Sequence, residues 1–71
     1  MDKIIIKVID EFWEYDNKDN LVAHVTEGEY EAELHKESGE YFSKDSEGRK
    51  FYVGELDILG QLELENGLII V

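Results

Sequence analysis

Short stretches of alternating apolar and polar residues recur along this chain, and turns that contain glycine separate several of them. In residues 29–36, tyrosine, alanine and leucine alternate with glutamate. Because successive side chains of a β-strand point to opposite faces, this alternation predicts a half-buried strand whose glutamates face solvent. A turn at 37–39 leads to a second predicted strand at 40–44, and a turn at 45–48 leads to a third at 49–53. These segments predict a three-stranded antiparallel meander.

The first half of the chain is less regular. A strand is predicted from residue 3 to about residue 12, with isoleucine or valine on both faces of its first part. Such a strand is typical of a sheet centre or of a small barrel in which it coils across two layers, and closure into a barrel accounts for it. Residues 16–20 predict a turn by composition, and residues 21–25 predict a short strand.

The chain after residue 53 predicts no long helix. Apolar residues at mixed spacing predict one short helical turn near residues 55–59, and residues 61–65 predict a closing strand. The chain ends on four apolar residues that favour β-structure, namely Leu68, Ile69, Ile70 and Val71. Because an exposed edge of this kind is prone to aggregate, we expect it to pair within the domain, beside the strand that contains Ile4. A swapped or edge-to-edge homodimer is the alternative.

Length and composition predict a single all-β domain over residues 1–71, with a small core. Hydrophobic residues make up 42% of the chain and include four tyrosines, three phenylalanines and one tryptophan, which argues against a disordered acidic tail. The absence of cysteine excludes disulfides, thiolate metal sites and cysteine nucleophiles. The apolar run at residues 4–6 is too short for a signal segment or a membrane span, so a cytoplasmic protein without membrane association is expected.

The net charge of −11 arises from 18 acidic residues against seven lysines and arginines. Such a surface repels the phosphates of nucleic acids and anionic lipids, so direct binding to nucleic acid is not expected. It favours a protein partner with a basic surface, which the charge would steer toward the molecule.

Four segments carry a resemblance to a known group of proteins. They are Gly28-Glu29-Tyr30-Glu31-Ala32, Ser38-Gly39-Glu40-Tyr41-Phe42, Asp45-Ser46-Glu47-Gly48-Arg49 and Phe51-Tyr52-Val53. In this pattern of strands and turns, residues 3–65 resemble the small SH3-like β-barrel proteins of bacteriophages and prophages. The resemblance implies a five-stranded barrel with a short helical turn and a phage or prophage context, but no activity. Peptide-binding SH3 domains carry a tandem tryptophan and a proline in their groove, whereas this chain has one tryptophan and no proline.

The first candidate site is a row of glutamates at every second position. Its members are Glu27, Glu29, Glu31 and Glu33. On one extended strand their carboxylates would lie roughly 6.8 Å apart, twice the rise per residue, and DNA phosphates are separated by a similar step. One hypothesis is therefore a DNA-mimic inhibitor of a host nucleic-acid-binding protein. The alternative, which charge runs usually support, is a solvated strand face.

The second candidate site consists of aromatic residues in the irregular segment. Trp13 and Tyr15 stand at alternate positions and would share one face of an extended backbone. Neighbouring aromatics of this kind can supply the contact area for a protein partner. In a barrel short of core volume, however, Phe12, Trp13 and Tyr15 more often cap one end, and we favour capping.

No arrangement of residues predicts catalysis, a cofactor or a metal site. His24 and His35 have no zinc-binding spacing, and residues 16–20 lack the glycine and closing glutamate of a calcium loop. Ser38, Ser43 and Ser46 have no histidine partner in the pattern. The sequence therefore predicts a non-enzymatic acidic binding module for a basic protein. The alternative is a structural or assembly protein that forms a homo-oligomer through its edge strands and its last four residues.

Overall fold

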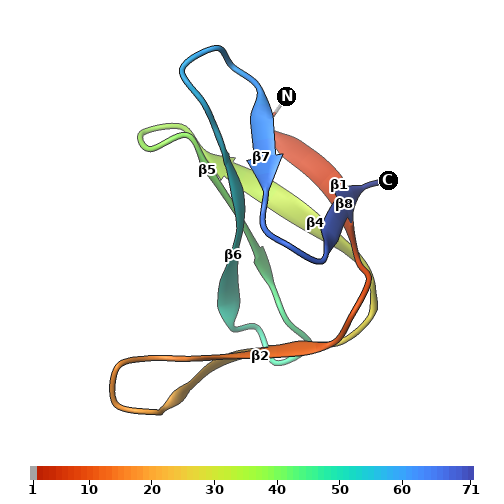
Figure 1. The fold of residues 1–71 in the computed structure, drawn as a ribbon, viewed down its shortest axis with the longest axis vertical. Coiled ribbons are helices and arrows are strands. Elements are labelled where there is room, and N and C mark those ends of the chain that lie inside the picture. Colours follow the sequence, from red (N-terminus) through yellow and green to blue (C-terminus); the bar gives the residue numbers. More distant parts are fainter. Residues whose placement is uncertain (1) are drawn as a thin grey trace.

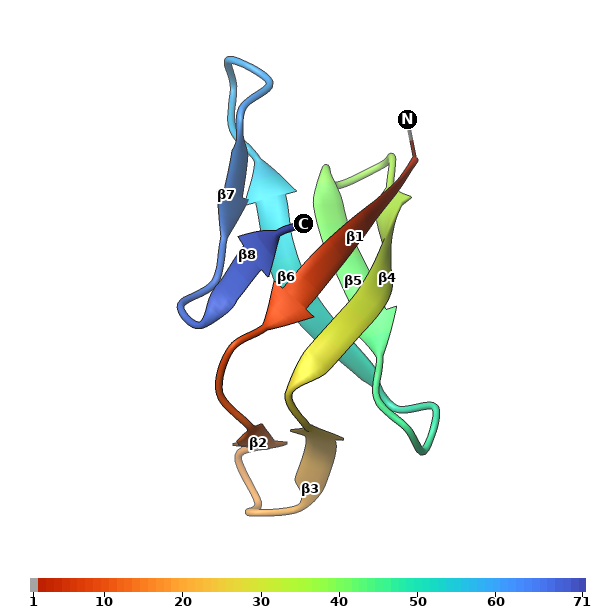
Figure 2. The same ribbon diagram turned by 90° about the vertical axis from the view of Figure 1, so that its right-hand side faces the viewer.

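The computed structural model describes residues 2–71, which form eight β-strands and no helix (Figure 1). The strands are β1 (Lys3–Val8), β2 (Phe12–Tyr15), β3 (Leu21–Val25), β4 (Gly28–His35), β5 (Glu40–Lys44), β6 (Lys50–Leu56), β7 (Leu62–Leu64) and β8 (Leu68–Ile70). Six of them form one antiparallel sheet in the order β7-β6-β5-β4-β1-β8, and β2 pairs with β3 in a separate hairpin. The larger sheet curls into a nearly closed, barrel-like form, and the hairpin lies across one end of it (Figure 2).

The core forms where the alternating positions of the curled sheet meet. The buried apolar residues are Ile6, Val8, Ala23, Val25, Ala32, Tyr41, Phe51, Val53 and Leu68. Phe51 is the largest side chain that is fully buried, and Phe12 and Tyr30 meet its ring edge-to-face at centroid distances of 5.9 Å and 5.8 Å. The prediction for residues 29–36 is confirmed, because Ala32 faces this core while Glu31 and Glu33 on the same strand are exposed.

The end of the chain pairs within the domain, as the sequence predicted. Strand β8 runs antiparallel to β1, with Ile70 opposite Ile6 and Leu68 opposite Val8. Leu68 is only 5% exposed, so this strand contributes to the core. Strand β1 consequently lies between β4 and β8, inside the sheet.

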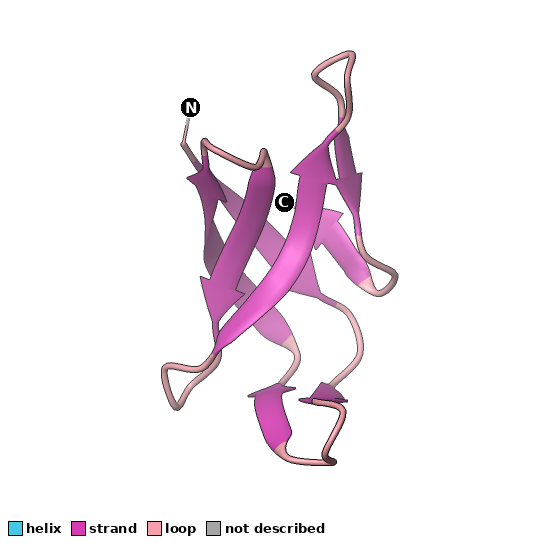
Figure 3. Ribbon diagram, turned by 90° about the vertical axis from the view of Figure 1, so that its left-hand side faces the viewer, coloured by secondary structure: helices cyan, strands magenta, loops and turns pink. Residues whose placement is uncertain are grey.

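Three details of the predicted fold are wrong. The main sheet has six strands within residues 2–71, not five, and the first strand ends at Val8 because the chain bends at Ile9 and Asp10 before β2 begins. The helical turn near residues 55–59 is absent. Strand β6 instead continues to Leu56, and a loop leads from it to β7 (Figure 3). Asp57 begins this hairpin turn, and its Oδ1 accepts the backbone N–H of Gln61 at 2.9 Å.

Strand β6 contains a bulge followed by a glycine that β7 approaches closely. The pairing of β5 with β6 shifts register between Tyr41 and Phe42, which leaves Val53 as an extra residue on β6. The next residue, Gly54, is buried against β7, and a Cβ added there would lie 2.2 Å from the carbonyl oxygen of Glu63. Only glycine fits at this crossing, so Gly54 sets how closely β7 packs against β6.

Within the described part of the chain, residues 2–71, no helix has the length and apolar character needed to cross a membrane.

Candidate functional site

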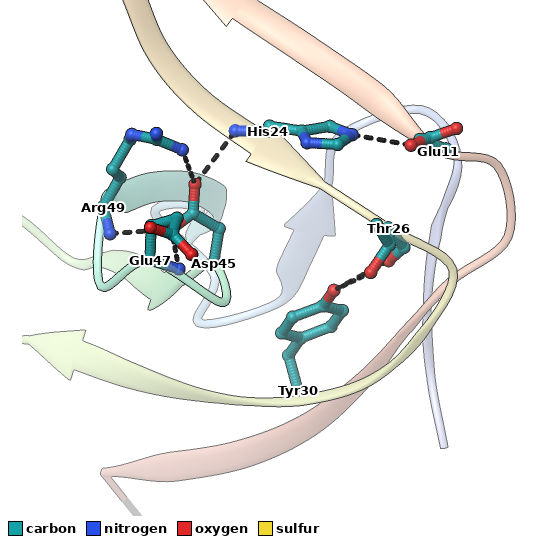
Figure 4. A network of polar contacts seen from close by, with 7 residues as sticks. All are labelled: Glu11, His24, Thr26, Tyr30, Asp45, Glu47 and Arg49. Atoms are coloured by element: carbon teal, nitrogen blue, oxygen red, sulfur yellow. Dashed lines mark hydrogen bonds and ion pairs between the residues drawn. The ribbon is translucent and has the colours of Figure 1, made fainter.

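The β2–β3 hairpin presents an aromatic residue on its outward face. Trp13 lies opposite His24 in the hairpin, and the two rings stack with centroids 4.8 Å apart and planes 4° from parallel. The Nε2 of His24 lies 2.6 Å from a carboxylate oxygen of Glu11 (Figure 4). This carboxylate holds the imidazole, and the imidazole supports one face of the indole. Trp13 is nevertheless 50% exposed, so its position is defined while much of its surface remains available.

Further large apolar side chains of the same hairpin are exposed. Tyr15 is 60% exposed, and Leu21 and Val22 at the far end of the hairpin are 41% and 39% exposed. The capping interpretation is therefore wrong for Trp13 and Tyr15, and it is right for Phe12, which packs against Phe51 in the core. Carboxylates accompany these apolar side chains, since Glu11 precedes β2 and the turn between the strands contains two aspartates.

A buried carboxylate joins the hairpin to the barrel. The Oδ2 of Asp45, in the turn between β5 and β6, accepts the backbone N–H of His24 at 2.9 Å and a guanidinium N–H of Arg49 at 3.1 Å (Figure 4). Its Oδ1 accepts the backbone N–H groups of Glu47 and Arg49. Burial of Asp45 opposes its ionisation, but these four hydrogen bonds outweigh it and hold the pKa at about 2.

A second contact ties the return from the hairpin to β4. The Tyr30 hydroxyl donates a hydrogen bond to the backbone carbonyl of Thr26 at 2.8 Å (Figure 4). Together with Asp45, this contact fixes the C-terminal end of β3, where the hairpin meets the barrel. The sequence predicts the turn at Asp45. It does not predict the hydrogen bond from the His24 backbone N–H to Asp45, because 21 residues separate the two partners.

The glutamate row is only partly formed, and lysines accompany it. Glu29, Glu31 and Glu33 are exposed on the outer face of β4, whereas Glu27 precedes the strand and is followed by Gly28 with a positive φ of 141°. The neighbouring strand β1 places Lys3 directly across from Glu33, and the Lys3 amine lies 3.7 Å from Glu31 and 3.9 Å from Glu33. The row therefore lies beside cations that the local sequence did not show.

The outer face of β4, β5 and β6 holds a groove that sequence reasoning missed. Its volume is about 530 Å³, and its lining includes Glu31, Glu33, His35, Phe42, Lys44 and Lys50. Phe42 contacts the ring of His35 at a centroid distance of 4.6 Å and that of Tyr52 at 5.8 Å. The three rings come from three strands, so no local spacing could have revealed this aromatic row.

The predicted site residues do not gather in one place. Glu31 and Glu33 line the outer groove, whereas Trp13 lines a different depression with Glu14 and Glu65 near β7. There the pKa of Glu14 is raised, first by burial and then by the nearby charge of Glu65. The two candidates are therefore separate surfaces.

The same part of the molecule contains a tyrosine with a shifted pKa. The Tyr52 hydroxyl donates a 2.6 Å hydrogen bond to Glu55, and this bond, burial and the surrounding carboxylates raise the tyrosine pKa to about 12. A neutral phenol is retained at neutral pH, so Tyr52 can contribute a ring and a hydrogen-bond donor.

The histidines and serines do not assemble a chemical site in the arrangement described. His24 contacts Trp13 and Glu11, while His35 packs on Phe42. Ser43 is buried and donates to the carbonyl of Glu31 at 2.6 Å. Across residues 2–71, no group of three or more His, Cys, Asp or Glu side chains is placed to hold a metal ion.

Comparison of this chain with protein-family models, with curated proteins and with solved structures finds no match. The resemblance to SH3-like phage proteins therefore stays a prediction.

Proposed function

We propose that this protein is a non-enzymatic acidic binding module that engages a basic protein surface through the outward face of the β2–β3 hairpin. The observation that carries the proposal is the half-exposed Trp13, stacked on His24 beside the exposed Tyr15. Aromatic residues are enriched among those that dominate binding energy at interfaces, and a ring already held in place loses little entropy on binding. The hairpin thus offers a pre-positioned apolar contact.

The net charge supplies the second part of the proposed mechanism. At −11 the molecule attracts a basic protein over a distance set by ionic strength, and this attraction raises the association rate. Contact of Trp13 and Tyr15 with the partner then slows dissociation. Affinity through such a surface should fall steeply as salt is added.

The DNA-mimic hypothesis is a narrower form of the same proposal. It receives less support than the hairpin, because Lys3 and Lys7 on β1 lie opposite Glu33 and Glu29 and offset part of the negative row. Replacing Glu29, Glu31 and Glu33 together by glutamine tests it, since a mimic would lose its partner. Unchanged binding would leave the hairpin as the contact.

An SH3-like barrel of phage or prophage origin, located in the cytoplasm, completes the proposal. The curled all-β sheet supports a barrel-like architecture, and the phage context rests on the resemblance of residues 3–65. The function proposed for the hairpin does not depend on either.

Affinity capture with matched variants tests the proposal. The immobilised protein is exposed to lysate of its native host at 25 mM and 500 mM NaCl, and the retained proteins are identified by mass spectrometry. The test variant is Trp13→Ala with Tyr15→Ala. The control is Ile58→Ala with Leu59→Ala, because both side chains are exposed on the turn between β6 and β7.

We expect a protein with a basic surface to be retained at low salt by the wild type and by the control, and to be lost from the Trp13 and Tyr15 variant. Retention by both variants alike would overturn the role of the hairpin. Retention of acidic proteins, or retention that salt leaves unchanged, would overturn the electrostatic mechanism.

A second candidate function is supported by the open edge of β8. Val71 donates its N–H to Ile5 on β1, so Ile70 directs its own N–H and carbonyl away from the sheet. Ile69, Ile70 and Val71 are 45%, 52% and 62% exposed. A second copy could add its own β8 there and build an assembly.

Light scattering after size-exclusion chromatography tests this alternative with Ile70→Lys, because a charge at the open edge opposes strand addition. An assembly built through β8 should become monomeric. Ile58→Lys is the control for an added charge at an exposed apolar site. An unchanged mass for Ile70→Lys would exclude the β8 edge as the contact.

A further inference from the structure

We propose that the groove over Phe42 binds the cationic head group of an arginine or lysine side chain from a basic partner, and that Lys50 of this chain occupies the same position until the partner displaces it. This inference rests on the proposed function, in that the partner is basic. It adds a second contact surface, on β4, β5 and β6, and the chemical group that this surface recognises.

The first argument is the position of Lys50. Its amine lies 4.3 Å from the centroid of the Phe42 ring, which is the geometry of a cation–π contact. Within residues 2–71, no carboxylate oxygen lies within 4.0 Å of this amine. The face of Phe42 therefore already holds a cation, and the ring alone holds it there.

The second argument is that Lys50 is held weakly. Lys44 lies directly across from it in the pairing of β5 with β6, and like charges at facing positions repel. A surface cation–π contact contributes only about 0.5–1 kcal/mol at an exposed site. A partner's cation could replace Lys50 and allow the two lysines to separate.

The third argument is the complementarity of the groove. Glu33 faces Phe42 across the β4–β5 pairing, and Glu31 lines the same groove. Lys3 approaches both glutamates but lies 3.7 Å and 3.9 Å from them, at the long end of ion-pair distances. A cation over Phe42 would thus meet an aromatic floor and a carboxylate wall. Arginine fits best, because its planar guanidinium stacks on a ring while it donates to carboxylates.

The decisive variant is Lys50→Met, which keeps an apolar chain over the groove but removes the competing cation. The probe is a hexa-arginine peptide in 20 mM NaCl, and its affinity is measured by calorimetry. Lys7→Met is the matched control, since it makes the same change in net charge at an exposed residue of β1, outside both the groove and the hairpin. Phe42→Leu, alone and combined with Lys50→Met, removes the aromatic face.

We expect Lys50→Met to bind the peptide about two- to fivefold more tightly than Lys7→Met does, which is the range that one exposed cation–π contact spans. Phe42→Leu should abolish this gain. Backbone and ring resonances of His35, Phe42 and Tyr52 should shift on titration in Lys50→Met, which locates the peptide in the groove even if the leucine variant folds poorly.

Equal affinities for Lys50→Met and Lys7→Met would overturn the inference, as would a gain that survives Phe42→Leu in a folded variant. In either case, peptide binding to the wild type would leave the acidic binding module standing. If neither the wild type nor any variant binds the peptide at 20 mM NaCl, the protein does not attract basic ligands. That result would overturn both the proposed function and the cation site over Phe42.

Discussion

Three hairpin turns of this protein are closed by the same arrangement around an aspartate. In each turn the aspartate Oδ1 accepts the backbone N–H groups two and four residues later. The fourth residue of each turn has a positive φ. The turns begin at Asp16, Asp45 and Asp57, and their fourth residues are Asp19, Gly48 and Gly60, with φ values of 63°, 81° and 78°. One turn therefore places a residue with a side chain where the other two place glycine.

Asp19→Gly should stabilise the protein. A left-handed conformation costs a residue with a Cβ roughly 1–2 kcal/mol, and less for aspartate. Glycine removes that cost but adds entropy to the unfolded chain, so we expect a net gain of about 0.5 kcal/mol. Urea denaturation should show a higher midpoint with an unchanged m-value.

Gly48→Ala provides the reciprocal measurement. No atom lies within 4 Å of a Cβ built at Gly48, so its positive φ is the only source of strain. The substitution should cost about 1 kcal/mol. If Gly48→Ala is neutral, or Asp19→Gly destabilises the protein, the backbone argument for these turns is wrong.

Asp45→Asn should remove a pH-dependent part of the stability. Because the pKa of Asp45 falls from its ordinary value of 3.8 to about 2 on folding, the folded state binds fewer protons than the unfolded state between these values. The contribution of the carboxylate is complete above pH 4 and is lost as the pH falls toward 2. The variant should therefore melt below the wild type at pH 6, and the difference should shrink between pH 4 and pH 2.

The control for this measurement is Asp10→Asn, an exposed carboxylate on the bend after β1. Neutralising it changes the net charge equally but should produce no difference that shrinks with acidification. A constant difference between Asp45→Asn and the wild type from pH 6 to pH 2 would contradict the role of the ionised carboxylate.

At the scale of strands, Gly54→Ala should distort the crossing of β6 and β7. The new Cβ would lie 2.2 Å from the Glu63 carbonyl oxygen, which is backbone and cannot rotate away. We expect destabilisation of about 2–3 kcal/mol, the upper part of the usual cost of forcing extra atoms into a packed site, because the clash is with backbone. Thermal melting and urea denaturation both measure it.

Combining Gly54→Ala with Glu63→Ala separates the backbone clash from a side-chain effect. The shorter side chain leaves the carbonyl in place, so the double variant should remain as unstable as Gly54→Ala. Recovery of stability in the double variant would show that the Glu63 side chain, and not the backbone, opposes the new methyl group.

The strands that the sequence predicted best are those with one solvent-exposed face and one buried face. Residues 29–36 alternate strictly, and Ala32 lies in the core as predicted. The helical turn predicted near 55–59 is wrong because turn chemistry, and not apolar spacing, determines the structure there. Asp57 and Gly60 stand at the same positions as Asp45 and Gly48, whose turn was recognised.

The hairpin and the outer groove were harder to predict for physical reasons. Glu14 faces the barrel while Trp13 and Tyr15 face solvent, which inverts the usual rule that apolar residues lie inside. The glutamate row could be read from spacing, but the Lys3 contacts depend on pairing between strands about 30 residues apart. The Phe42 groove likewise needs three strands in register before it exists.

At the scale of the whole molecule, the domain is so small that its negative charges lie within range of one another. The principal extents are 34 × 25 × 19 Å, and the net charge is −11. At 0.01 M ionic strength the screening length is about 30 Å, so nearly every pair of carboxylates interacts. At 0.1 M it is about 10 Å, and repulsion across the molecule is largely removed.

Added NaCl should therefore raise the melting temperature, by a few degrees between 10 mM and 150 mM, because the folded state holds the charges closer together than the unfolded chain does. Sodium chloride is preferred to sulfate, which stabilises proteins by exclusion from their surface.

The control is the combination of Glu27→Gln, Glu37→Gln and Glu63→Gln, which reduces the net charge from −11 to −8 at three exposed positions. This variant should melt higher at 10 mM NaCl and respond less to salt. A melting temperature that stays flat or falls with NaCl would mean that local ion pairs such as Lys3 with Glu31, which salt weakens, outweigh the overall repulsion.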